Sequence, residues 1–122
     1  MRRWVLVGAL SMAVAVALGA FGAHALRDVF DSKQMEWWHT AQEYQVWHAL
    51  ALVVAGLIEG QTGRSMRAVA WLFVAGTLVF SGSLYLMALT GQTWLGAITP
   101  FGGAAFIAGW ITLAVVVAQR KD

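Results

Sequence analysis

The sequence predicts an all-α integral membrane protein in which a single domain, residues 1–122, forms a four-helix bundle. Two long segments contain no Asp, Glu, Lys or Arg, one between Arg3 and Arg27 and the other between Arg67 and Arg120. The composition agrees, since 60% of the residues are hydrophobic and 11% are charged, outside the usual balance of a soluble domain. A hydrocarbon core about 30 Å thick takes roughly 20 apolar residues in a helix, because charge there is costly and backbone groups must bond internally.

The first span is predicted from about Trp4 to Leu26, directly after a pair of arginines. A second interpretation is open, because a basic start, an apolar run and the triplet Ala23, His24 and Ala25 also fit a cleaved secretory signal peptide. The apolar run is longer than the roughly 7 to 15 residues of a signal core. This length favours a span that is retained.

The second span is predicted over residues 39–58, preceded by an amphipathic stretch in the membrane interface. Its uncharged part, Tyr44 to Ile58, is too short to cross the bilayer alone. Asp31 followed by Gln34 fits a helix N-cap with its capping-box partner, so the helix is expected to begin near Ser32. Aromatic residues just after this start suit the aromatic belt at a membrane surface.

The third and fourth spans are predicted over residues 68–90 and 100–119, with a short polar turn after the third. Thr99 fits a helix N-cap and Pro100 the first helical residue, since proline lacks only a donor that would be unsatisfied there. Residues 94–98 would then form an interfacial connector. The alternative is a longer helix kinked at Pro100.

Basic residues predict the orientation of the bundle. In a four-span arrangement six of them lie on one side of the membrane and two on the other. The six are Arg2, Arg3, Arg64, Arg67, Arg120 and Lys121, and the two are Arg27 and Lys33. The positive-inside rule therefore predicts that both termini are cytoplasmic, and an odd number of spans would erase the bias. We expect a multi-pass protein of the bacterial inner (plasma) membrane, since the chain is short and lacks an organelle presequence.

Polar side chains are predicted to gather in the outer half of the bundle, whereas the inner half is mainly aliphatic. At about 1.5 Å per residue, His48 lies near mid-depth. The polar residues in this half are His24, Glu43, His48, Ser81, Ser83, Tyr85 and Thr99. Ionisable residues inside a membrane are functional candidates because burying them is costly. Interhelical polar contacts also hold bundles in register, so ligand binding and packing both stay open for this cluster.

No metal site, cofactor or catalytic centre is predicted. His39 and Glu43 share a helix face, but His48 lies about 180° round the helix from His39. A metal site would need His24 together with Glu43 or His48 and a partner subunit. The chain has no Cys, which excludes thiolate ligands and cysteine nucleophiles, and the common hydrolase, nucleotide and zinc motifs are absent. The chain is therefore not expected to be an enzyme.

Small residues at helical spacings are predicted to let neighbouring helices approach closely. The candidates for helix packing and for the start of the fourth helix are Gly19, Gly82, Pro100, Gly102 and Gly103. Gly102 and Gly103 lie near a helix N-terminus, which could instead admit an anionic group. No Gly-rich phosphate loop accompanies them, so packing is the preferred interpretation.

Four sequence segments carry a resemblance to a known family. They are GAFGAH from Gly19 to His24, TAQEYQVWHALAL from Thr40 to Leu52, FSGSLYLMALTG from Phe80 to Gly91, and LGAITPFGGAAFIAGW from Leu95 to Trp110. With these segments the chain resembles the domain-of-unknown-function 423 family, small membrane proteins that include transmembrane protein 256. The match covers all four spans in order. It implies a four-helix integral membrane protein, and the family has no established biochemical activity to carry over.

The resemblance also sorts the candidate residues. It adds Gly22, Tyr44 and Gln45. The other motif positions coincide with those from the depth argument: His24, His48, Ser81, Ser83, Tyr85, Thr99, Pro100, Gly102 and Gly103. His39 and Glu43 fall where the family is expected to be permissive, which weakens any metal site that depends on them.

Two functions from different classes are expected. The first is a non-enzymatic membrane protein that binds a partner, lipid or small hydrophobic ligand through the outer polar cluster. The alternative is a small transporter or channel-forming subunit that acts as an oligomer with His48 or Tyr85 facing a shared pathway, because four short helices enclose little space. The expected partners are the lipid bilayer and either a second copy of the chain or another membrane protein. Paired basic residues at helix ends suit lipid headgroups better than nucleic acid.

Overall fold

The computed structural model describes residues 1–119, which form four helical rods with no strand among them. The first two rods are α1 (Arg2–His24) and α2 (Ser32–Thr62), and the third consists of α3 (Arg67–Gly76), the π-helical η1 (Thr77–Ser81) and α4 (Gly82–Thr90). The fourth rod, α5 (Thr99–Ala118), follows a short 3₁₀ segment, η2 (Thr93–Ala97). The predicted all-α class with four helices is confirmed.

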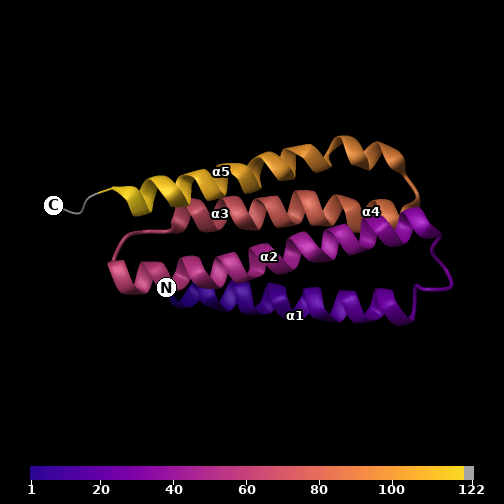
Figure 1. Cartoon of the computed structure of the whole chain (residues 1–122), viewed down its shortest axis with the longest axis horizontal. Coiled ribbons are helices and arrows are strands. Elements are labelled where there is room, and N and C mark those ends of the chain that lie inside the picture. The colour runs from indigo at the N-terminus through magenta and orange to yellow at the C-terminus, as the bar shows by residue number, and fades with distance from the viewer. Residues whose placement is uncertain (120–122) are drawn as a thin grey trace.

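The rods lie side by side, and consecutive rods run in opposite directions (Figure 1). The N-terminus, the α2–α3 loop and the end of α5 lie at one end of the molecule, which we call the amino end (Figure 1). The α1–α2 connection and the turn before α5 lie at the other (Figure 1). At the amino end the guanidinium of Arg64 donates to the carbonyl of Val116. The Glu59 carboxylate accepts from the backbone amide of Met66 at 2.8 Å, so side chains hold the α2–α3 loop.

The start of α2 is a complete capping box. The Asp31 carboxylate accepts a hydrogen bond from the Gln34 amide at 2.8 Å, and the Gln34 side chain accepts one from the Asp31 amide at 3.0 Å. Two backbone donors that have no partner within the helix are satisfied in this way. The predicted start near Ser32 is confirmed. The stretch predicted to precede the second span is therefore the first part of α2 itself.

Three helical segments among the described residues are long and apolar enough to cross a membrane. They are Arg2–His24, Arg67–Thr90 and Thr93–Ala118. The helix α2 is longer, but polar residues such as Glu43, Gln45 and His48 lower its mean hydropathy. The predicted boundaries of the first and third spans differ from the helix ends by one or two residues at most, which is the usual uncertainty of helix ends.

Two pairs of rods pack most closely, and glycines lie at both contacts. Between α1 and α2, a Cβ on Gly8 would lie 2.7 Å from the carbonyl oxygen of Ala49. Between α3 and α5, a Cβ on Gly109 would lie 2.6 Å from the ring of Phe73. Real Cβ atoms essentially never come this close to another atom. The molecule is thus built from two helical hairpins, α1 with α2 and the third rod with α5.

The third rod contains a π-helical turn, η1, at its centre. A π turn closes its hydrogen bonds over five residues instead of four and so rotates the following residues round the helix axis. Gly82 comes directly after this turn, and a Cβ there would meet nothing within 4 Å. The prediction that Gly82 packs against another helix is therefore wrong.

The start of α5 also differs from the prediction. The helix begins at Thr99 and not at Pro100, and Ile98 occupies the N-cap position without a side-chain cap. The Thr99 hydroxyl instead points back to the carbonyl of Leu95, at 3.4 Å. Because η2 brings a turn of helix directly before α5, the hydroxyl finds an acceptor there. Pro100 does lie in the first turn of α5, where its missing amide proton costs nothing.

Candidate functional site

Gln45 joins three rods. It is buried on α2, and its side-chain nitrogen donates to the backbone oxygen of Ser11 on α1 at 3.1 Å and lies 3.4 Å from the Ser11 hydroxyl. Its side-chain oxygen accepts a hydrogen bond from the Tyr85 hydroxyl on α4 at 2.7 Å. Two residues of the predicted cluster, Gln45 and Tyr85, therefore meet. Such interhelical bonds average about 0.6 kcal/mol in membrane proteins.

His48 is held by a hydrogen bond on each ring nitrogen. Its Nδ1 lies 2.8 Å from the backbone oxygen of Tyr44, and its Nε2 accepts from the indole N–H of Trp110 at 3.0 Å. A carbonyl oxygen and an indole N–H are an acceptor and a donor only, so the proton of the ring is assigned to Nδ1 and Nε2 carries the lone pair. His48 is thus a neutral bridge between α2 and α5, and its lone pair is occupied.

The Tyr44 ring lies among the aromatic rings that surround His48. The His48 ring stacks on Phe106 with centroids 3.6 Å apart and planes 10° apart. The Tyr44 ring lies 4.4 Å from that of Phe80 and 6.1 Å from that of Phe106. Aromatic pairs with ring centroids about 4.5–7 Å apart, such as Tyr44 and Phe106, add about 0.5–1.5 kcal/mol beyond area burial. The structure therefore brings Tyr44 and His48 together in an aromatic layer between α2, η1 and α5.

Three hydroxyl residues of the predicted cluster, on η1, α4 and α5, tie rods together. The hydroxyls of Ser83 on α4 and Thr99 on α5 lie 2.6 Å apart. The buried Ser81 hydroxyl donates to the backbone oxygen of Ala41 on α2 at 2.7 Å. Each of these polar groups is paired within the chain, as buried groups in an apolar medium require.

His24 lies apart from the rest of the predicted cluster. Its side chain is exposed at the end of α1 and makes no hydrogen bond with any residue in 1–119. His24 does end α1, as predicted, but its side chain does not join the other polar groups of the cluster. His39 and Glu43 form an exposed pair with 2.8 Å between Nε2 and Oε1. Within residues 1–119 no three His, Asp or Glu side chains gather in a way that could hold a metal ion.

The predicted packing glycines fall into two groups. Gly22 and Gly102 leave no room for a methyl group, because a Cβ would lie 2.6 Å from Trp38 Cδ1 and 2.7 Å from Phe80 Cα, respectively. Gly19 is tight against the Gln42 side chain at 3.0 Å. Gly103 has only ordinary contact, with the Phe80 ring 3.8 Å away.

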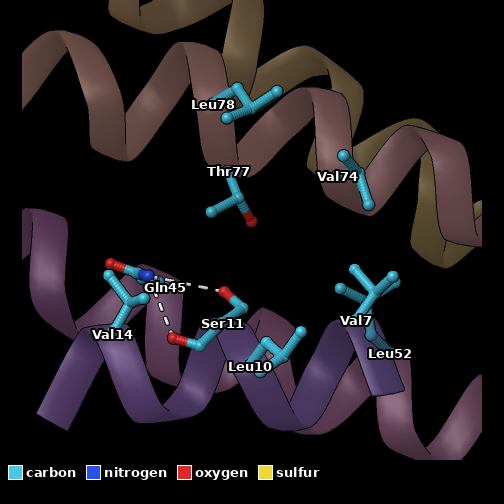
Figure 2. A pocket seen from close by; sticks show the side chains of 9 residues that line it. All are labelled: Val7, Leu10, Ser11, Val14, Gln45, Leu52, Val74, Thr77 and Leu78. Carbon is cyan, nitrogen blue, oxygen red and sulfur yellow. Dashed lines mark hydrogen bonds between the residues drawn. The ribbon is translucent and has the colours of Figure 1, made fainter. Parts of the chain in front are cut away.

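An open groove lies between α1 and the third rod, beside the polar cluster (Figure 2). It has a volume of about 340 Å³. The lining residues are Val7, Leu10, Ser11 and Val14 of α1, Gln45 and Leu52 of α2, Val74 of α3, and Thr77 and Leu78 of η1. Leu10, Val14 and Leu78 are more than half exposed, so the groove opens to the outside of the molecule. We call it the α1–η1 groove.

The α1–η1 groove is apolar and uncharged. Six of its nine lining residues are aliphatic, the other three are Ser11, Gln45 and Thr77, and none is Asp, Glu, Lys, Arg or His. Only Gln45 is shared with the predicted cluster. Apart from the exposed His24 and Glu43, the other predicted polar groups make their contacts inside the protein, so the open space lies next to the cluster and not within it. The arrangement suits binding of an apolar molecule better than acid–base chemistry.

Three residues at the site were missed by sequence reasoning, namely Ser11, Thr77 and Trp110. A signal was present for each. Ser11 is the one hydroxyl residue in α1, and Thr77 is the first in the third rod. Trp110 lies within the fourth span, although tryptophan is enriched at membrane surfaces. A polar group far inside an apolar run requires a partner, and this rule could have selected all three.

Comparisons with known proteins agree with this description. The family described as "Protein of unknown function (DUF423)" matches residues 18–103. A UPF0382 membrane protein of Staphylococcus epidermidis is 47% identical over 119 residues, and the UPF0382 membrane protein YwdK of Bacillus subtilis is 44% identical over 121 residues. Each alignment covers 98% of both chains. No solved structure matches. With its apolar helices, the chain is a multi-pass membrane protein with bacterial relatives, and it belongs to the DUF423 family.

Proposed function

We propose that the protein is a non-enzymatic membrane protein that binds a small hydrophobic molecule from the bilayer in the α1–η1 groove. The observation that carries the proposal is the groove itself, about 340 Å³ in volume and lined mainly by aliphatic side chains. Ligand sites in proteins measure about 300–1,000 Å³ and are mostly apolar with a few polar groups. Because the groove opens between two segments that can cross a membrane, an occupant would enter from the lipid phase.

The size of the groove favours a small molecule over a partner helix. The space is bounded by side chains of α1, α2 and the third rod, and an α-helix is about 10 Å across. A single hydrocarbon chain is much thinner and can lie along α1 without displacing it.

The polar cluster supports this proposal because its hydrogen bonds join the rods to one another. Gln45 with Tyr85, His48 with Trp110, and Ser83 with Thr99 each bond across two rods. Together with the bond from Gln45 to Ser11 on α1, they connect the rods that form the groove walls. The transporter alternative requires His48 or Tyr85 to face a pathway, and both side chains are instead engaged inside the chain, so no contact favours it.

We infer that all four rods cross the membrane and that the amino end faces the cytoplasm. The arrangement of the rods supports this, since α2 runs alongside α1 between the two ends (Figure 1). Arg2, Arg3, Arg64 and Arg67 belong to the amino end, whereas Arg27 and Lys33 belong to the other. Arg120 and Lys121, which contribute to the predicted bias, lie outside the described residues.

Single cysteines test this orientation, because the chain has none of its own. Val29→Cys lies in the α1–α2 connection and Ser65→Cys in the α2–α3 loop, and both positions are exposed. With a membrane-impermeant maleimide, we expect Val29→Cys to be labelled in intact cells. Ser65→Cys should react only after the cells are permeabilised. Labelling of both from outside would contradict four spans, and the reverse pattern would contradict the orientation.

Native mass spectrometry of the protein gently extracted from its own membrane tests the groove. We expect an extra mass on the wild-type chain. Val14→Trp should reduce its occupancy about 5-fold or more, since the larger side chain fills part of the groove and a loss of about 1 kcal/mol in binding free energy corresponds to this factor. Val16→Trp is the matched control, because Val16 is on the same helix and similarly exposed, 59% against 51% for Val14, but does not line the groove. Bare chains, or equal occupancy in both variants, would refute the proposal.

A further inference from the structure

Two hydroxyl groups face the α1–η1 groove from opposite walls. Ser11 lies on α1 and Thr77 at the start of η1, and Figure 2 shows both side chains directed into the space between the helices. Apart from Gln45, the remaining lining side chains are aliphatic. π-Helical turns such as η1 are rare and often occur at functional sites. The chemistry available to an occupant is therefore set by these two hydroxyls.

The hydrogen bonds within the protein leave one donor and one acceptor available to an occupant of the groove. Gln45 is engaged at both ends, with Ser11 and with Tyr85. The Ser11 hydroxyl oxygen receives the Gln45 contact at 3.4 Å, and its own proton is donated to no residue in 1–119. The Thr77 hydroxyl donates to the carbonyl of Phe73 at 2.9 Å, and no described residue donates to its oxygen. The Ser11 hydroxyl can thus donate a hydrogen bond to an occupant of the groove, and the Thr77 hydroxyl can accept one.

We propose, on the basis of the function proposed above, that the occupant of the α1–η1 groove is an uncharged lipid alcohol. Its hydroxyl oxygen accepts from Ser11 and its proton is donated to Thr77, because an alcohol is both a donor and an acceptor. A hydrocarbon leaves both groups of the groove unused, and a carbonyl satisfies only Ser11. A carboxylate, phosphate or ammonium group would be a charge without a counter-ion, since no charged side chain lines the groove.

Photolabelling with three matched probes tests the ligand class. Dodecanol, dodecane and dodecanoate derivatives carry a diazirine at the same carbon, and labelled positions are mapped by mass spectrometry on the full-length protein in lipid nanodiscs. We expect the alcohol to label groove residues of α1 and η1 about tenfold more than the hydrocarbon, since it makes two additional hydrogen bonds. The carboxylate should label them least.

Two variants test whether the preference for the alcohol probe depends on the Ser11 and Thr77 hydroxyls. Ser11→Ala and Thr77→Val should each reduce labelling by the alcohol several-fold and leave labelling by the hydrocarbon unchanged. Thr112→Val is the matched control, because Thr112 makes the same bond to the carbonyl four residues earlier, at 2.7 Å, but does not line the groove. This variant should keep the wild-type preference for the alcohol.

The failures of the two proposals are distinguishable. Equal labelling of the groove by alcohol and hydrocarbon, or strongest labelling by the carboxylate, would overturn the lipid alcohol and keep a hydrophobic ligand site. Absence of groove labelling by every probe would overturn the site itself. The comparison of probes on the wild-type protein needs no variant, so it holds even where a substitution prevents folding.

Discussion

Gly102→Ala is expected to lower the free energy of unfolding by about 3 kcal/mol, the upper part of the range for overpacking one methyl group. The new Cβ would lie 2.7 Å from the Cα of Phe80 and closer still to its backbone nitrogen. Because these are backbone atoms, no side-chain rotation relieves the contact. The helix α5 must move away from η1, which would also disturb the neighbouring bond between Ser83 and Thr99.

Two neighbouring glycines provide matched controls for Gly102→Ala. A Cβ on Gly103 meets only the Phe80 ring, at 3.8 Å, and a Cβ on Gly82 meets nothing within 4 Å. Alanine has the higher helix propensity, so both substitutions should be neutral or stabilise by up to about 1 kcal/mol. Unfolding in mixed micelles with increasing SDS, followed by circular dichroism, measures all three. Similar losses for Gly102→Ala and Gly103→Ala would show that helix contact is not the cause.

Much of the fold was predictable because bilayer physics leaves few choices. Charge-free runs of sufficient length specify helices, and Asp31 with Gln34 marked the start of α2 correctly. The errors have local causes that the sequence does not display. The π turn before Gly82 changes which face that residue presents, and the 3₁₀ turn before Thr99 supplies its hydroxyl with a carbonyl at Leu95.

The candidate site was predictable only in part. Depth and the family motif selected Gln45, His48 and Tyr85, which do make interhelical bonds. They also selected His24, which is exposed. The α1–η1 groove could not be predicted, because it exists where two rods do not pack closely. Its hydroxyls, Ser11 and Thr77, were not predicted, because neither lies in one of the four segments that carry the family resemblance.

Trp110→Phe is expected to lower the free energy of unfolding by about 1–3 kcal/mol, the cost of leaving a buried acceptor unpaired. The substitution removes the indole N–H that bonds to His48 Nε2 at 3.0 Å and keeps an aromatic ring beside Phe73. His48 is only 4% exposed, so water cannot readily replace the donor. Trp94→Phe is the control, since Trp94 is 63% exposed and its indole N–H has no hydrogen bond to any described residue. The same unfolding measurement should show little change for it.

A double substitution separates loss of the bond from loss of packing. His48→Phe together with Trp110→Phe removes the acceptor and the donor at once, and replacing both partners with apolar groups is often nearly neutral. The double variant should therefore be more stable than the sum of the two single losses predicts. Additive losses would mean that the two residues do not act as a pair.

The hydrogen bond between His48 and Trp110 also allows a test of whether His48 has a structural role or carries protons. With Nδ1 facing the Tyr44 carbonyl and Nε2 facing the Trp110 N–H, the wild-type ring should show the neutral Nδ1–H tautomer in ¹⁵N NMR spectra. A proton added to Nε2 would face the indole N–H, and two donors cannot bond. Proton transfer through His48 would thus require Trp110 to leave, and a spectrum with Nε2 protonated in the folded protein would contradict the structural role.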